Sequence, residues 1–188
     1  MADQAAWRAW LEANHDSSPG IWLVLHKKGG TVTAMTHALA LDEALCFGWI
    51  DGQARRRDDE SSLQKMTPRR PRSTWSARNV TYIARLEAEG RMHPAGRAAV
   101  AAAKADGRWD NAYAGPATAE VPADLAAAIA ANPEARAMFD VLTRTNRFAL
   151  IHRLGQVKRE ETRVRKIGEF VEMLARHETP HPQKAKPE

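Results

Sequence analysis

The chain has 188 residues, of which 44% are hydrophobic and 27% are charged, a composition typical of a globular protein. No run approaches the roughly 18 consecutive apolar residues of a membrane-spanning helix, and the first residues lack the basic region and apolar stretch of a secretory signal. We therefore expect no membrane span and a cytoplasmic location. A single cysteine, Cys46, excludes an internal disulfide, and its apolar neighbours predict a buried, inert thiol.

The net charge of +5 is unevenly distributed along the chain. Residues 55–78 contain eight basic and three acidic side chains, and residues 144–166 contain eight basic and two acidic ones. Acidic side chains outnumber basic ones in the rest of the chain. Such polarisation bears on the partners of a protein and not on its fold, so an anionic partner is expected.

The first predicted elements are a helix, a strand and a second helix. Trp7, Trp10 and Leu11 recur at spacings of three and four within "QAAWRAWLEANH", which predicts an amphipathic helix. The nearly continuous apolar run "GIWLVLHKK" predicts a strand that is covered on both faces. A second helix is predicted over about residues 36–47, with Gly48 at its end.

The polar stretch that follows predicts an exposed hairpin. Its first arm is expected around residues 49–57 and its second around residues 62–67, with the acid-rich "DDESS" at the turn. Pro68 and Pro71 would stop the second strand. Three consecutive arginines end the first arm, so the hairpin is predicted to carry a basic surface.

Helices are predicted for the rest of the chain. Two cover about residues 76–89 and 94–107, and a linker with Gly115-Pro116 separates them from a purely helical C-terminal part. The sequence therefore predicts an α+β fold with an N-terminal helix and small-sheet domain over residues 1–110, a linker over 111–121, an all-helical domain over 122–178 and a flexible tail over 179–188.

The last helix is predicted to combine an apolar stripe with a basic ridge. The stripe consists of Val164, Ile167, Phe170, Val171 and Leu174. The ridge consists of Arg159, Arg163 and Lys166, at spacings of four and three, and we interpret it as a solvated face with internal salt bridges.

Recognisable catalytic and metal-binding motifs are absent from the sequence. It contains no phosphate loop, no GxSxG or HExxH motif and no paired CxxC. Among the seven histidines only His177 and His181 have a spacing of four, and Pro180 interrupts any helix between them. We therefore expect no metal and no cofactor.

Several segments are long and unusual in composition. They are "EALCFGWIDG", residues 43–52, and "TPRRPRSTWSARN", residues 67–79, with "GIWLVLHKK" before them and "LTRTNRFALIHRL" and "VKREETRVRKI" after them. In this order of segments the chain resembles, over nearly its whole length, the YdeI/OmpD-associated family, also called bacteriocin-protection proteins. The resemblance implies a cytoplasmic α+β protein with a helical C-terminal domain and an association with envelope stress, and it implies no particular reaction.

Five arginines near the predicted hairpin are the candidate anion-binding residues. They are Arg55, Arg57, Arg69, Arg70 and Arg72. Side chains alternate along a strand, so Arg55 and Arg57 share one face, and the prolines hold the other three in an extended segment. Guanidinium groups beside an indole can bind phosphates and stack on bases. The alternative is a solvated basic face with cation–π packing inside the protein.

Three further residues are candidates for lining a pocket: Trp49, Asp51 and Trp75. Asp51 precedes the arginines and could orient a guanidinium through a bidentate pair. Alternatively, Asp51 and Gly52 form only a turn or bulge where strand pairing begins.

Two classes of function remain open. The first is a non-enzymatic binding protein whose basic surface takes an anionic partner, either nucleic acid or an acidic protein. The second is an enzyme that acts on a small anionic substrate in a pocket between the domains, lined by Asp51 and the arginines. The absence of catalytic motifs favours the first class. The oligomeric state stays open.

Overall fold

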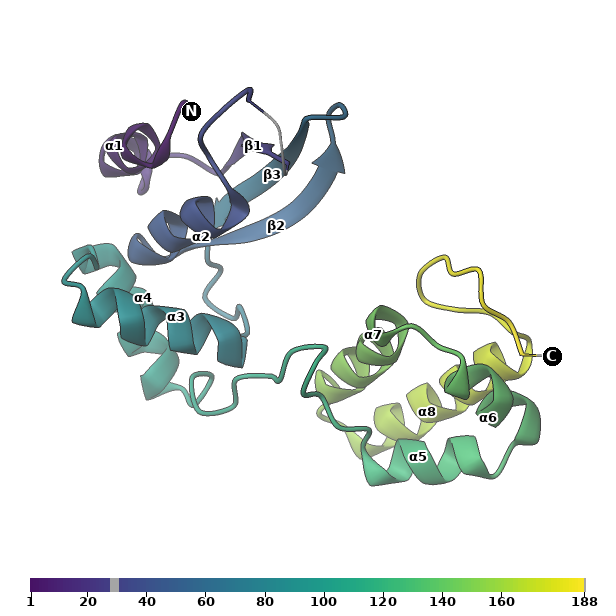
Figure 1. The fold of residues 1–188 in the computed structure, drawn as a ribbon. Helices are drawn as coiled ribbons and strands as arrows, with labels where there is room; N and C mark the ends of the chain where they lie inside the picture. Colours follow the sequence, from purple (N-terminus) through teal and green to yellow (C-terminus); the bar gives the residue numbers. More distant parts are fainter. Residues whose placement is uncertain (28–30, 188) are drawn as a thin grey trace. The chain divides into compact units, whose positions relative to one another are not determined.

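The computed structural model describes residues 1–27 and 31–187, so Lys28 of the predicted strand and Glu188 of the predicted tail lie outside the described residues. The chain divides into two compact units, Met1–Ala112 and Tyr113–Glu188, and each has its own hydrophobic core. The first unit combines helices with a three-stranded antiparallel sheet, and in the second unit the described elements are helices (Figure 1). The predicted α+β class is confirmed.

The elements follow one another closely along each unit. The first unit contains α1 (Gln4–Asn14), β1 (Ile21–His26), α2 (His37–Cys46), β2 (Trp49–Arg56), β3 (Ser61–Pro68), α3 (Ala77–Ala88) and α4 (Pro94–Ala105). The second unit contains α5 (Ala123–Ala130), α6 (Pro133–Asp140), α7 (Arg144–Gly155) and α8 (Glu160–Ala175). None of the helices in the described residues is long and apolar enough to cross a bilayer.

Helix α2 is the buried centre of the first unit. The Oγ1 of Thr36 caps its start by accepting a hydrogen bond from the backbone N–H of Leu39 at 3.2 Å, and residues 40–46 are all buried. The indole Nε1 of Trp7, on α1, donates to the carbonyl oxygen of Ala40 at 3.0 Å. The chain leaves the helix through Gly48, whose φ of +75° favours glycine. The predicted second helix is confirmed.

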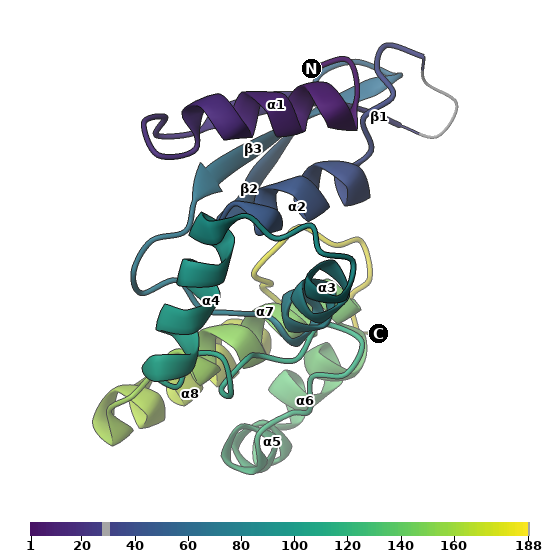
Figure 2. The ribbon, with the colours of Figure 1, turned by 90° about the vertical axis from the view of Figure 1, so that its left-hand side faces the viewer.

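The sheet has the strand order β1–β3–β2, so β3 is the central strand. Along β1, Leu23 and Leu25 are buried, whereas Trp22 and Val24 are half-buried. Figure 2 shows α1 and α2 on the same side of the sheet. The prediction that the first strand is covered on both faces is therefore wrong, because the described helices of this unit pack on one face only.

The second unit is a small helical bundle around residues from all four of its helices. Leu125, Met138, Leu150 and Phe170 come from α5, α6, α7 and α8 respectively, and all are buried. The side chain of Asn132 caps α6 by accepting from the backbone N–H of Ala135 at 2.9 Å. Each helix contributes one apolar stripe, so the core depends on all of them.

The predicted apolar stripe of the last helix is one residue too long. Ile167, Phe170 and Leu174 are buried, but the side chain of Val164 is 62% exposed. At 100° per residue, Val164 lies roughly 90° around the helix axis from the centre of the three buried positions. Its spacing of three from Ile167 is helical, but its direction is away from the core.

The start of the segment predicted to be a flexible tail is hydrogen bonded to the buried Asn146 on α7. The Asn146 side-chain amide donates to the carbonyl oxygen of His181 at 3.0 Å and to Oε1 of Gln183 at 2.8 Å. The backbone N–H of His181 donates to Oδ1 of Asn146 at 2.8 Å. These bonds connect the segment after α8 to the start of α7.

Cys46 is expected to be inert towards thiol reagents in the native protein. Its side chain is 0% exposed, and burial together with the neighbouring Glu43 raises the pKa of the thiol to about 11. The reactive thiolate is then on the order of one part in ten thousand at pH 7. Labelling with a thiol reagent should be slow without denaturant and complete in urea. Rapid quantitative modification of the folded protein would contradict this expectation.

Candidate anion-binding face

The open face of the sheet carries one aromatic and two basic side chains in contact. Trp22 of β1 lies opposite Lys65 of β3, and in the next row Val24, Leu63 and Arg55 lie side by side across the three strands. The Cζ of Arg55 is 4.7 Å from the centroid of the Trp22 ring, and the Nζ of Lys65 is 5.9 Å from it. We call these five residues, Trp22, Val24, Arg55, Leu63 and Lys65, the Trp22 face.

A β-bulge in β2 directs Arg55 to this face. The pairing register shifts between Asp51, opposite Met66, and Ala54, opposite Gln64, and the side-chain amide of Gln64 donates to the carbonyl oxygen of Gly52 at 3.0 Å. An extra residue in one strand reverses the faces of all the residues that follow it. Without the bulge, Arg55 would point to the helix-covered side.

The same bulge separates Asp51 from the arginines. Asp51 lies on the side of the sheet that the helices cover, and its Oδ2 is 3.0 Å from the Nε2 of His37 at the start of α2. The predicted bidentate pair with a following arginine is therefore replaced by a pair with histidine. The alternative interpretation of Asp51 and Gly52, a bulge, is the one that the strand pairing supports.

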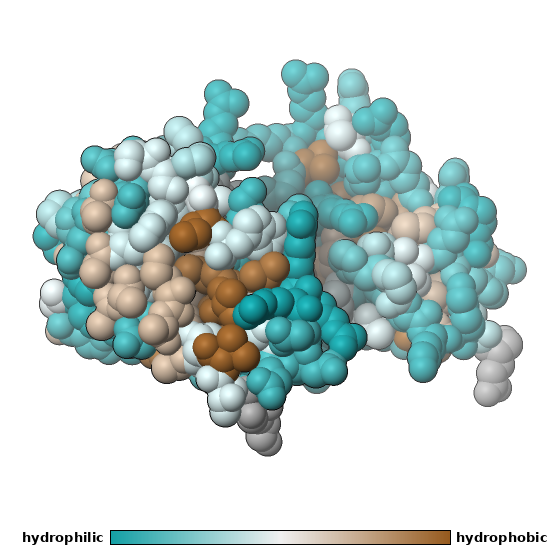
Figure 3. Space-filling model, turned by 90° about the horizontal axis from the view of Figure 1, so that it is seen from above, coloured by the Kyte–Doolittle hydropathy of each residue, from teal (hydrophilic) through white to brown (hydrophobic). Residues whose placement is uncertain are grey.

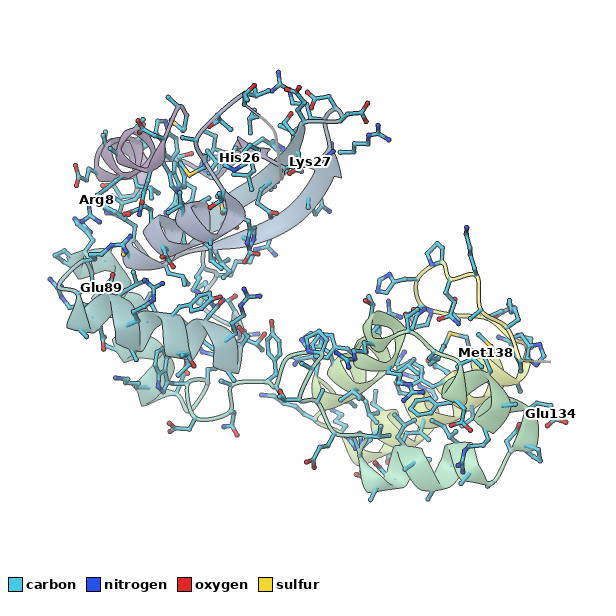
Figure 4. The ribbon with its side chains drawn as sticks, in the orientation of Figure 1. Arg8, His26, Lys27, Glu89, Glu134 and Met138 are labelled. Carbon is cyan, nitrogen blue, oxygen red and sulfur yellow. The ribbon has the colours of Figure 1, made fainter. Side chains whose placement is uncertain are left out.

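The charges at the hairpin turn compensate one another. Arg56 pairs with Asp59, and Arg57 lies 3.7 Å from a carboxylate oxygen of Asp58. A hydrogen bond from the Ser61 hydroxyl lowers the pKa of Asp58. Lys27, which directly follows β1 and is labelled in Figure 4, donates to the carbonyl oxygen of Asp58. By contrast, no carboxylate among the described residues forms an ion pair with Arg55 or Lys65.

The other three candidate arginines lie at the opposite end of the hairpin. Arg55 is level with Leu63, and Arg69 is six positions after Leu63, about 20 Å along an extended chain. Arg70 and Arg72 are exposed there. The five arginines predicted as one site therefore form two groups, with Arg55 and Arg57 at one end and Arg69, Arg70 and Arg72 at the other.

Arg69 and both tryptophans of the predicted pocket belong to the interior packing. The Cζ of Arg69 lies 3.6 Å from the centroid of the Trp75 ring, and its Nη1 donates to the carbonyl oxygen of Thr74 at 3.1 Å. Trp75 is 1% exposed and makes an edge contact with Trp109. Trp49 is also 1% exposed. Neither ring is available to stack on an external base.

Sequence reasoning missed Trp22 and Lys65. The signal for Trp22 is in "IWLVLH", in which every second side chain, Trp22, Val24 and His26, falls on one face of the strand. The run is apolar on both faces, so composition alone concealed which of them is open. A large aromatic side chain beside two cations on an open face is the feature that the fold adds.

A buried charge network was also missed. The carboxylate of Glu43 on α2 is 3% exposed and accepts hydrogen bonds from Arg8 at 2.9 Å and from Arg91 at 2.7 Å. Burial opposes the charge of Arg91, but hydrogen bonds to Glu89 and Glu43 outweigh burial and raise its pKa. Arg8 and Glu89 come from α1 and from the end of α3 (Figure 4). The network joins three helices and is structural.

The basic ridge of the last helix is mostly paired. Arg163 makes a bidentate contact with Asp124 at 2.5 and 2.9 Å, and Lys166 lies 2.7 Å from Glu169. The interpretation of this ridge as a face with internal salt bridges is confirmed for these two residues.

Viewed from above, the molecule shows hydrophobic residues next to strongly hydrophilic ones (Figure 3).

The two parts of the chain match different family models. Residues 1–99 match the model described as a domain of unknown function, DUF8412. The chain belongs to the DUF8412 family. Residues 118–177 match the model described as "Bacteriocin-protection, YdeI or OmpD-Associated", which confirms the predicted resemblance for the second unit. No curated protein and no solved structure was found to match the chain.

The DUF8412 part contains the whole Trp22 face. It also contains "EALCFGWIDG" and "TPRRPRSTWSARN", two of the segments that carry the resemblance to the YdeI/OmpD-associated family. The YdeI/OmpD-associated match begins at residue 118, beyond these segments. The description of that family therefore concerns the helical second unit, and the function of the first unit has to be argued from its own residues.

Proposed function

We propose that this DUF8412 protein is a cytoplasmic, non-enzymatic binding protein whose Trp22 face takes an anionic partner. The observation that carries the proposal is the convergence of Arg55 and Lys65 on Trp22, without an ion-pair partner for either cation among the described residues. We also propose that this binding underlies the association with bacteriocin protection that the second unit's family description names, and the association with envelope stress that the resemblance implies.

The electrostatics of the face support an anion. Exposed cations that are already paired with carboxylates gain little from a further anion, as at the Arg56–Asp59 and Arg57–Asp58 pairs. Among the described residues, the charges of Arg55 and Lys65 are stabilised by the ring of Trp22 alone, and such a contact contributes about 0.5–1 kcal/mol at an exposed site. An anionic group therefore finds its strongest new interactions at these two side chains.

The enzyme alternative has less support. It required Asp51 and the arginines to line one pocket, and Asp51 is paired with His37 on the other side of the sheet. Among the described residues no group of three or more histidine, cysteine, aspartate or glutamate side chains could hold a metal ion.

Arg55→Ala should weaken binding of a base-free polyanion, and Arg56→Ala should not. The probe is a fluorescein-labelled phosphodiester chain of abasic units, about 12 units long. The slope of log K against log salt should fall by about one for Arg55→Ala, because one phosphate contact is lost. Arg56 is the neighbouring residue on the same strand but is paired with Asp59. Equal slopes for wild type and Arg55→Ala in fluorescence anisotropy titrations would contradict the proposal.

A further inference from the structure

We infer that the anionic partner of the Trp22 face is a single-stranded nucleic acid, with a base stacked on the Trp22 ring and phosphates held by Arg55 and Lys65. This inference rests on the proposed function and names the class of partner. Its starting point is the contact of one half-buried indole with two cations, the three side chains coming from three neighbouring strands.

The geometry gives each part of a nucleotide a matching group. Neighbouring strands lie about 4.8 Å apart, so the rows that contain Trp22 with Lys65 and Val24 with Leu63 and Arg55 form a surface about 10 Å wide. The indole offers a π-face to a base, and the half-buried Val24 and Leu63 offer apolar contact beside it. The cations at 4.7 and 5.9 Å from the ring are within reach of the flanking phosphates.

The magnitudes favour displacement of Arg55 from the ring by a base. The cation–π contact contributes about 0.5–1 kcal/mol at an exposed site. Stacking of a base on an aromatic side chain contributes about 1–3 kcal/mol. The guanidinium that leaves the ring gains a charge-assisted hydrogen bond to phosphate. The guanidinium of Arg55 and the indole of Trp22 therefore each interact more strongly with a single strand than with one another.

The other polyanions use only part of this face. In a duplex the bases are stacked on one another, so no base is available to stack on Trp22. Proteins that recognise a duplex commonly insert a helix or a β-ribbon into its groove. On the open side of the sheet, four of the five side chains of the Trp22 face are half-buried and Arg55 is exposed. None of the described helices of the first unit covers this side. An acidic protein segment offers carboxylates to Arg55 and Lys65 but leaves the indole without a stacking partner.

The decisive experiment compares probes that have the same charge but differ in bases. Labelled oligothymidylate of about 12 nucleotides, the abasic chain of equal length and a duplex of equal length are titrated against wild type, Trp22→Leu and Trp22→Phe at low salt. Wild type should bind oligothymidylate about 5- to 100-fold more tightly than the abasic chain. Trp22→Leu should lose this preference, so that its affinities for oligothymidylate and for the abasic chain differ by no more than about twofold, and Trp22→Phe should retain most of the preference.

The possible results separate the inference from the proposed function. Equal affinities of wild type for oligothymidylate and the abasic chain, or tighter binding of the duplex, would overturn the inference and leave the anion-binding face in place. The same holds if Trp22→Leu keeps the preference for bases. If wild type binds none of the three probes at tens of micromolar protein, the proposed function and the inference both fall. Circular dichroism of each variant verifies that the sheet is intact.

Discussion

Gly96→Ala should strongly destabilise the first unit. A Cβ at position 96 would lie 2.1 Å from the carbonyl oxygen and 2.7 Å from the carbonyl carbon of Cys46. Both atoms belong to the backbone at the end of α2, so no side chain can move aside. Helix α4 would have to withdraw from α2, which would break the hydrogen bond from the His93 N–H to the Cys46 carbonyl, 3.0 Å long. We expect a loss of more than about 3 kcal/mol, the upper end of the usual range for overpacking.

Gly168→Ala is the matched control for this substitution. Gly168 lies inside α8, is exposed, and a Cβ there would meet no atom within 4 Å. Alanine should stabilise that helix by about 0.5–1 kcal/mol. Urea denaturation followed by circular dichroism measures both effects. A melting temperature of Gly96→Ala close to that of wild type would show that α2 and α4 do not approach each other as the structure has them.

Glu43→Gln should destabilise the first unit by about 3 kcal/mol. The glutamine keeps the shape of the side chain but removes the charge that Arg8 and Arg91 share at 2.9 and 2.7 Å. Removing one partner of a buried ion pair lowers the free energy of unfolding by about 3–5 kcal/mol. We expect the lower end of that range, because the side chains of Arg8 and Arg91 remain 33% and 26% exposed to solvent.

Glu12→Gln is the control, because it removes an exposed ion-pair partner of the same arginine, Arg8. Glu12 lies 3.3 Å from Arg8, but its side chain is 55% exposed. Removal of this charge should change the free energy of unfolding by less than about 1 kcal/mol. Chemical denaturation of both variants at neutral pH gives the comparison. If Glu12→Gln and Glu43→Gln destabilise the protein equally, burial does not strengthen the network and our account of it fails.

Local patterns in the sequence predicted most of the helices. Trp7 and Leu11 recur at helical spacing and are buried in α1, and Pro94 stands in the first turn of α4 as its restricted φ favours. The same reasoning placed Val164 in the core of α8, because a spacing of three does not by itself define the direction of a side chain around the helix axis. Periodicity indicates an element and only approximately its buried face.

The sequence by itself determined the α+β class, the positions of the helices and the concentration of basic residues near the hairpin. Only the tertiary structure decided which face of β1 is open, that a bulge directs Arg55 to that face, and that Arg69 lies at the far end of the hairpin. Likewise, Glu43 meets Arg8 and Arg91 across separations of 35 and 48 residues. Spacing and capping act between near neighbours in the chain, whereas strand register and charge pairing join distant residues, and packing alone selects among the partners that the composition allows.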